Sequence, residues 1–297
     1  METRGSIVHG GSFRRVLGLV SVGLTTVALS FAASTAHADL RYVRTPTKAL
    51  PDGDHGSAKA TCPSGTHVLG GGQYVFSGLN DATLDTSTPF DGDDRGRAPD
   101  DGWKSTVRSF SASNTLTVFA VCAGSEPSYA KEVIHVGGLQ SFTGRTTCQR
   151  GRVMGGGARL PVSFDDDAWL ESSSPFDGND ADAQPDNGWT ATGGVGERNL
   201  DMTVTAICGS GTLKYSADRG TAPAMSFGEA AADCPGESRI VGGGTEAIGV
   251  AFHPITISSP YDDGDPNNKP DDGWQGEFDN YSSSDPGLIT AFAICKV

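Results

Sequence analysis

The chain uses one stretch of sequence three times. Its opening cysteines, Cys62, Cys148 and Cys234, recur every 86 residues. Each copy continues with a Gly-Gly-Gly triplet, a proline followed by an aromatic residue and Asp, a Pro-Asp-Asp-Gly-Trp or Pro-Asp-Asn-Gly-Trp segment, and a hydrophobic run that ends in a second cysteine. A fixed period of this length makes the repeat the structural unit. We therefore expect three equivalent units, at residues 42–126, 127–212 and 213–297.

Residues 1–38 have the pattern of an export signal. Arg14 and Arg15 form a basic segment, residues 16–33 are mostly apolar, and Ala36-His37-Ala38 fits a cleavage site. A membrane anchor is the alternative because the apolar run is long, but no charged flank follows it. We expect the signal peptide to be removed and the mature chain to be secreted, extracellular and not inserted in a membrane.

The formal net charge is −14, and it becomes −16 without residues 1–38, which hold three arginines and one glutamate. A surface of this sign repels nucleic acid and anionic lipid. We therefore expect neither of them as a partner.

The six cysteines form three pairs, one in each repeat, with partners separated by 60, 60 and 61 residues. Disulfides persist in oxidising compartments such as the extracellular space. Each bridge would close a loop of about 60 residues and contribute roughly 4 kcal/mol on the loop-entropy model. Export, the even count and one pair per repeat together predict the bridges Cys62–Cys122, Cys148–Cys208 and Cys234–Cys295.

The periodicity within each repeat is that of β-strands. Buried and exposed residue types alternate along the closing segments 116–122 and 202–208. The 41 glycines and the frequent Pro, Asp and Ser breaks fit short strands joined by turns. Either each unit is a separate sandwich, or three sheets surround a pseudo-threefold axis. Because a unit of 86 residues buries little surface alone, we predict an all-β fold of three disulfide-stapled, sandwich-like antiparallel units with β-prism-like packing.

The glycine triplets begin at Gly70, Gly155 and Gly242. A phosphate-binding loop would require a helix directly after the glycines, whereas Gln73-Tyr74-Val75-Phe76 has the composition of a strand. We therefore expect β-bulges or close backbone approaches at the triplets.

Acidic loops precede the Gly-Trp segments and together carry a net charge of −11. Clustered carboxylates on glycine-rich loops suit Ca²⁺, although their spacing does not match an EF-hand. The alternative is that these residues bond the backbone of solvated turns. The candidate metal ligands are Asp91, Asp93, Asp94, Asp100, Asp101, Asp177, Asp180, Asp182, Asp186, Asp262, Asp263, Asp265, Asp271 and Asp272.

The tryptophans Trp103, Trp189 and Trp274 follow these loops directly. An exposed indole beside carboxylates and amides suits a sugar site, and three copies would add avidity. The alternative is a core tryptophan packed near its own disulfide, as in immunoglobulin-like domains. We name the three as candidate ligand-binding residues and keep both interpretations open.

Catalytic motifs are sparse. The sequence has no G-x-S-x-G or H-E-x-x-H motif, and every cysteine has an expected partner. Among the histidines after residue 38 only His67 has a repeat-equivalent position, opposite Arg152 and Arg239, so a repeated histidine metal site is excluded. A hydrolytic site between units would require residues peculiar to one repeat to meet in a single cleft; such residues are His253, Glu171 and Glu246.

The ordered set of motifs, with its Cys-Pro-x-Gly start complete at Cys62-Pro63-Ser64-Gly65, resembles repeats of secreted actinobacterial proteins. The resemblance covers nearly all of the chain after residue 38, and the second repeat departs from it at Gln149, where the others have proline. It implies secretion and a disulfide-stapled β module, and no activity. The threefold repetition is also similar, at the level of fold only, to the β-prisms of vitelline-membrane outer-layer proteins and lectins.

These observations favour a secreted, non-enzymatic binding or structural protein without a catalytic residue. A polysaccharide or cell-surface glycan is the first expected ligand. The alternatives are a secreted hydrolase with one site between repeats and an extracellular protein-interaction module or inhibitor.

Overall fold

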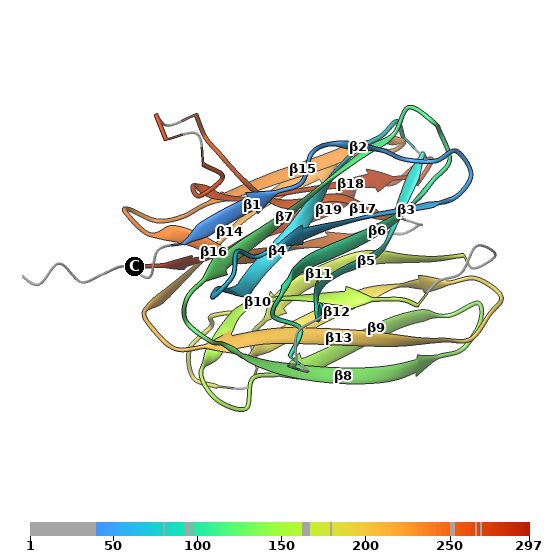
Figure 1. Ribbon diagram of the computed structural model, residues 1–297. Helices are drawn as coiled ribbons and strands as arrows, with labels where there is room; N and C mark the ends of the chain where they lie inside the picture. The colour runs from blue at the N-terminus through green and yellow to red at the C-terminus, as the bar shows by residue number, and fades with distance from the viewer. Residues whose placement is uncertain are drawn as a thin grey trace, which may run out of the picture. The chain divides into compact units, whose positions relative to one another are not determined.

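The computed structural model describes residues 40–79, 81–92, 96, 98–161, 167–178, 180–249, 253–264, 266–267 and 269–297. These residues form strands β1 to β19 and no helix (Figure 1). The predicted all-β class is confirmed. The predicted export signal lies outside the described residues.

The strands form three antiparallel sheets. In spatial order, sheet 1 contains β1 (Arg41–Arg44), β7 (Thr115–Ala123), β4 (His67–Phe76), β17 (Ile255–Tyr261), β18 (Gly273–Asn280) and β15 (Ser226–Asp233), with the short β2 (Lys48–Ala49) beside β7. Sheet 2 contains β3 (His55–Thr61), β6 (Gly102–Ser109), β5 (Ala82–Phe90), β10 (Arg152–Arg159), β13 (Leu200–Gly209) and β8 (Ser128–Val136). Sheet 3 contains β14 (Leu213–Ala222), β19 (Gly287–Lys296), β16 (Arg239–Ile248), β11 (Ala168–Phe176), β12 (Gly188–Val195) and β9 (Ser141–Thr147).

Each sheet is built from two repeats. In sheet 2, for example, β3, β6 and β5 come from the first repeat, and β10, β13 and β8 come from the second. The two three-stranded halves of one repeat pack on each other as a small sandwich, and each half continues into a half of a neighbouring repeat. The sandwich and the pseudo-threefold arrangement, which the sequence offers as alternatives, are therefore combined in one fold.

The two halves of a sheet meet along a narrow seam. The seam strands β11 and β16 pair at only two positions, and the last pair joins Ser173 to Thr245. Two residues later stands Pro175, which has no N–H to continue a ladder. The proline of each repeat thus marks where the strands of two repeats part. The seams of sheets 1 and 2 end in the same way, at Ser258 before Pro260 and at Ser87 before Pro89.

The first glycines of the three triplets meet on the pseudo-threefold axis. Each lies beside a register shift in its strand, which is the predicted β-bulge. A Cβ added to Gly70 would lie closer than 3.0 Å to backbone atoms of Val241 and Gly242. Gly155 and Gly242 face the backbone of the first and second repeats in the same cyclic manner, so only glycine allows the three strands to approach this closely.

One disulfide links the two halves of each repeat. The three bridges are the predicted Cys62–Cys122, Cys148–Cys208 and Cys234–Cys295. The largest cluster of buried apolar side chains contains residues of all three repeats, among them Val68, Leu160 and Ile294. A shared core therefore holds the sheets together. Three disulfides also fit an oxidising environment.

Candidate functional site

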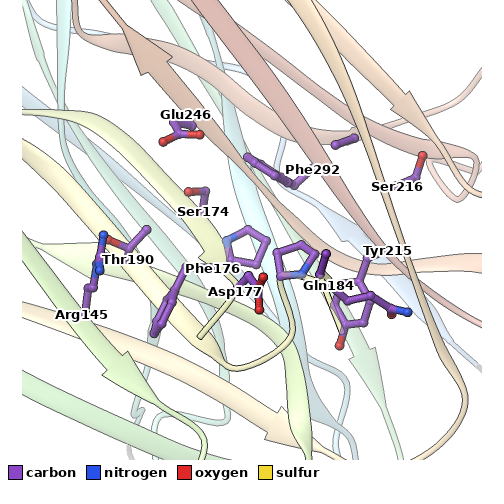
Figure 2. Close-up of a pocket in the computed structure, with 14 residues that line it drawn as sticks. Arg145, Ser174, Phe176, Asp177, Gln184, Thr190, Tyr215, Ser216, Glu246 and Phe292 are labelled. Carbon is purple, nitrogen blue, oxygen red and sulfur yellow. The ribbon is translucent and has the colours of Figure 1, made fainter. Parts of the chain in front are cut away.

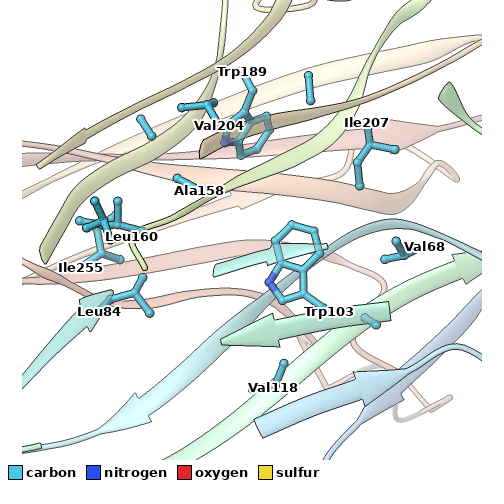
Figure 3. Packing of buried hydrophobic residues seen from close by; sticks show 14 of the residues in the cluster. Val68, Leu84, Trp103, Val118, Ala158, Leu160, Trp189, Val204, Ile207 and Ile255 are labelled. Atoms are coloured by element: carbon cyan, nitrogen blue, oxygen red, sulfur yellow. The ribbon is translucent and has the colours of Figure 1, made fainter. Parts of the chain in front are cut away.

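The three repeat-equivalent tryptophans are buried. Trp103 and Trp189 are 1% exposed and Trp274 is 0% exposed, and Figure 3 shows Trp103 and Trp189 among the core side chains. A ring at this burial has no free face for a sugar, so the ligand-binding interpretation of these residues is wrong for this structure. The core interpretation is correct, although each ring packs on the middle glycine of a triplet.

Each indole N–H has a partner inside the core. Trp189 Nε1 donates to Ser173 Oγ at 2.9 Å. A buried tryptophan N–H without an acceptor would be unfavourable by a few kcal/mol, so this serine belongs to the same packing unit. The other two pairs are Trp103 with Ser87 and Trp274 with Ser258.

The first acidic residue of each Pro-Asp segment faces an arginine or a histidine on the neighbouring strand. In the second repeat the Asp186 carboxylate lies 2.9 Å from Arg152 Nε. Burial raises the pKa of Asp186, and the guanidinium of Arg152 opposes that rise. The carboxylate is therefore a buried partner of a strand residue and not a free ligand. The equivalent pairs are His67 with Asp100 and Arg239 with Asp271.

The second polar residue of each segment closes a turn. Asn187 Oδ1 accepts a hydrogen bond from the backbone N–H of Gly178. Such a bond replaces a backbone partner in the turn, as the local-turn interpretation predicts. In the other repeats Asp101 accepts from Gly92 N–H, and Asp272 accepts from Asp263 N–H.

One group of candidate metal ligands comes together among the described residues. Carboxylate oxygens of Asp180, Asp182 and Asp186 lie within 4.8 Å of one another. Arg152 lies 3.6 Å from Asp182 and 2.9 Å from Asp186, and Asp180 accepts a hydrogen bond from Asn187. Because Arg152 already pairs with two of the three carboxylates, this donor set is a poor fit to Ca²⁺. Asp93, Asp94 and Asp265 lie outside the described residues.

The residues peculiar to one repeat meet only in part. His253 Nε2 lies 3.8 Å from Glu171 Oε2, and Trp169 Nε1 donates to Glu171 at 2.9 Å. His253 is 8% exposed, and neither it nor Glu171 lines the grooves described below. Glu246 lines one of those grooves instead.

A groove of about 480 Å³ opens on the outer face of sheet 3, where its two repeats part. Figure 2 shows Phe176 and Arg145 on one side of it and Tyr215 and Gln184 on the other. The ring of Phe176 lies 5.4 Å from the Arg145 guanidinium. Aromatic rings, a carboxylate, an amide and hydroxyls therefore share one concave surface. The remaining polar lining comes from Ser174, Asp177, Thr190, Ser216 and Glu246, and Phe292 adds a further ring.

An equivalent groove of about 540 Å³ lies on sheet 1, between the first and third repeats. Tyr261 and Asp262 stand there where Phe176 and Asp177 stand in sheet 3. The same seam thus produces a groove of similar composition on two sheets. The further equivalent lining residues are Tyr42 with Tyr215, Phe119 with Phe292, Pro270 with Pro185 and Gln275 with Thr190.

The tyrosine at the base of each groove is a clasp between repeats. Tyr215 of the third repeat donates its O–H to the backbone carbonyl of Val153 in the second, at 2.9 Å. Burial raises the pKa of the Tyr215 hydroxyl, so it remains a donor at any ordinary pH. Because its hydroxyl is already bonded to the Val153 carbonyl, we assign Tyr215 a structural role. The other two clasps are Tyr42 to Ile240 and Tyr129 to Val68.

The groove aromatics Phe176 and Tyr261 were not predicted from the sequence, although a signal was present. Each repeat has an aromatic residue directly after its proline: Phe90, Phe176 and Tyr261. The proline pairs with the buried tryptophan of the neighbouring strand, and because side chains alternate along a strand, the aromatic residue after it points to the outer face of the sheet.

No model of a protein family matches the chain, and a search of curated proteins found no similar sequence. Within the described ranges no helix is long and apolar enough to cross a membrane.

Proposed function

We propose that this is a secreted, non-enzymatic binding protein whose outer sheet faces hold carbohydrate or another cell-envelope polymer. The observation that carries the proposal is the pair of equivalent grooves on sheets 3 and 1, each formed where two repeats part. A surface feature that recurs with the repeat offers several copies of one site, and linked copies raise the overall affinity for a polymer.

The lining of the grooves favours a sugar. Phe176 and Tyr261 supply apolar ring faces, and Asp177 and Asp262 beside them are exposed acceptors. A sugar has an apolar face that packs on an aromatic ring and hydroxyls that donate to carboxylates and amides. In sheet 3 the ring is also flanked by Arg145, which can donate to ring or hydroxyl oxygens.

A protein partner is the second candidate, and exposed apolar side chains at strand ends favour it. Phe76 is 63% exposed, Ile248 54% and Leu288 52%. These side chains do not line the two grooves. A protein that binds through them would be insensitive to changes in the grooves.

The proposal is tested by co-sedimentation of the purified chain with insoluble polysaccharides and isolated cell-wall material. Gln184 is exposed and bonds only through its backbone, so Gln184→Ala alters the sheet 3 groove without loss of fold. Phe176→Ala removes the ring. We expect each change to weaken binding about five- to tenfold, which corresponds to the loss of one polar or stacking contact.

The matched control is Gln140→Ala, an exposed glutamine in the turn between β8 and β9, outside both grooves. It should bind as the parent protein does. If the parent sediments with none of the polymers, or if Gln184→Ala and Phe176→Ala bind as tightly as Gln140→Ala, the grooves are not the binding surface.

A further inference from the structure

The outer face of sheet 2 is positively charged although the chain as a whole is strongly acidic. Lys59 on β3, Lys104 on β6, Arg159 on β10 and Lys131 on β8 lie on this face, because their strand neighbours such as Trp103 point into the core. We call these four residues the cationic face. They spread across the whole sheet, from one edge strand to the other.

Threonines are the cross-strand neighbours of three of the four cations. Lys104 pairs with Lys59 on one side and with Thr88 on the other. Lys131 pairs with Thr205 at the far edge of the sheet. Arg159, near the middle, pairs with a threonine on each side. Thr86, Thr88 and Thr205 are buried beneath the cations, and Thr106 and Thr203 are half-buried.

The cations of this face have no acidic partner within the part of the chain that the structure describes. None of the ion pairs there includes Lys59, Lys104, Lys131 or Arg159. Burial lowers the pKa of Lys104, and the nearby charges of Arg159 and Lys59 lower it further. The positive charges therefore repel one another.

The fold does not require these charges. Lys104 corresponds by repeat to Thr190 on sheet 3 and to Gln275 on sheet 1, and Arg159 corresponds to Glu246 and Tyr74. Two like charges directly opposite on neighbouring strands, as in the pair Lys59 and Lys104, destabilise a sheet. A binding role accounts for a cluster that the packing of the sheet does not need.

We propose that the outer face of sheet 2 binds an anionic polymer, whose acidic groups lie on the four cations. Six strands span five intervals of about 4.8 Å, or roughly 24 Å, which exceeds the length of a single sugar. The ligand is therefore a chain with acidic groups along its length. Its charges are carboxylates of a polyuronate or phosphates of a polyol-phosphate polymer, and both place anions at regular intervals.

The inference rests on the proposed function only in taking the outer sheet faces as the binding surfaces. The chemistry differs from that of the grooves on sheets 1 and 3, so the two can fail separately. Loss of polyanion binding with retained binding of neutral polysaccharide would remove this inference and leave the proposed function intact.

The test compares two charge-matched double variants of the full mature chain. Lys104→Gln with Arg159→Gln removes two charges from the cationic face. Lys214→Gln with Arg219→Gln removes two exposed charges from β14, on the edge of sheet 3. Both substitutions keep a polar side chain of similar length, and the melting temperature of each variant shows whether it is folded.

Binding is measured by titration calorimetry with polygalacturonate and, separately, with a poly(glycerol phosphate), at low and at physiological salt. We expect the parent to bind at least one polymer with an affinity that falls as salt increases. The variant of the cationic face should bind at least tenfold more weakly, and the β14 variant as the parent does. Equal losses in the two variants, or no binding of either polymer by the parent at low salt, would overturn the proposal.

Discussion

The smallest structural unit of this protein is a tryptophan, a glycine and a serine. Trp189 packs on Gly156, where an added Cβ would meet the ring closer than 3.0 Å, and its N–H bonds Ser173. Gly156 and Trp189 are 33 residues apart in the sequence, and the glycine triplet and the Gly-Trp segment are therefore parts of one packing arrangement.

Gly156→Ala tests this arrangement. The new methyl group would force the buried Trp189 ring or the backbone of the neighbouring strand to move, and overpacking of this kind costs about 1–3 kcal/mol. Urea unfolding of the variant should give a lower midpoint than the parent. Gly124→Ala is the control, because nothing lies within 4 Å of the added Cβ there, and its midpoint should be unchanged.

Asp85 supplies a pH prediction at the same scale. Burial raises the pKa of its carboxyl well above the ordinary 3.8, and the charge of Arg108 opposes only part of the rise. His55 Nε2 lies 3.5 Å away. Because the folded pKa exceeds the unfolded one, the contribution of this carboxyl to stability is complete below about pH 3.8 and declines as the pH rises toward the folded pKa.

Asp85→Asn should therefore gain stability relative to the parent as the pH rises from 3 to 8. The measurement is the free energy of unfolding of both proteins across that range. Exposed Asp218→Asn should show no such trend. A parent–variant difference for Asp85 that is flat with pH would mean that the carboxyl titrates normally.

The sequence predicted the disulfide bridges and the β-bulges, but it did not predict whether the tryptophan side chains are buried or exposed. An indole after a Pro-Asp-Asp-Gly turn has the same sequence signature whether it points inward or outward. The choice depends on Gly71, Gly156 and Gly243, which clear space for the rings from other strands. Likewise, the acidic loops suggested metal ligands, and the histidine and arginines that face Asp100, Asp186 and Asp271 become visible only when strands distant in sequence are brought together.

Among the elements, the seams between half-sheets decide where the grooves form. Each seam has two paired positions and then a proline, so the strands separate there, and on sheets 1 and 3 a groove opens. The tyrosine clasps hold the repeats together beside these openings. The seams could not be predicted from the sequence, because periodicity identifies a strand but not the neighbour with which it pairs.

Tyr215→Phe should weaken the junction of the second and third repeats. It removes the hydrogen bond to the Val153 carbonyl and keeps the ring, at a cost of about 1 kcal/mol. Combined with Tyr129→Phe at another junction, the two costs should add. Tyr74→Phe, in an exposed tyrosine on sheet 1, is the control and should leave the unfolding midpoint unchanged. A Tyr215→Phe protein as stable as the control would show that the clasp contributes nothing.

At the scale of the molecule, the three repeats form one cooperative unit because each sheet is built from strands of two repeats, an arrangement we call strand sharing. A single repeat has two half-sheets whose seam partners belong to its neighbours. Residues 127–212 alone would expose both seams and the axis glycines, and a segment of this size has little core of its own. The expression of these residues as a separate chain should therefore give an unfolded or aggregated product, even with its disulfide formed.

The full chain should unfold in one calorimetric transition whose van't Hoff and calorimetric enthalpies agree. Three separate transitions would contradict strand sharing as the basis of stability. The repeat length and the disulfides predicted three units, whereas the exchange of half-sheets depends on contacts between residues of different repeats that no local pattern records.

The three sheet faces also differ in charge across the whole molecule. Sheet 2 carries the cationic face, whereas sheet 1 carries Glu229 and Glu277, which are directly paired across β15 and β18. Positions that are equivalent by repeat therefore carry side chains of different charge on different sheets.

The most direct test is amide chemical-shift mapping of the labelled mature chain during titration with oligosaccharides released from cell-envelope polymer. We expect shifts for neutral fragments around Phe176 and Gln184 on sheet 3 and around Tyr261 on sheet 1, and for acidic fragments around Lys104 and Arg159 on sheet 2. Shifts confined to the exposed strand ends at Phe76, Ile248 and Leu288, or no shifts with any fragment, would contradict both proposals.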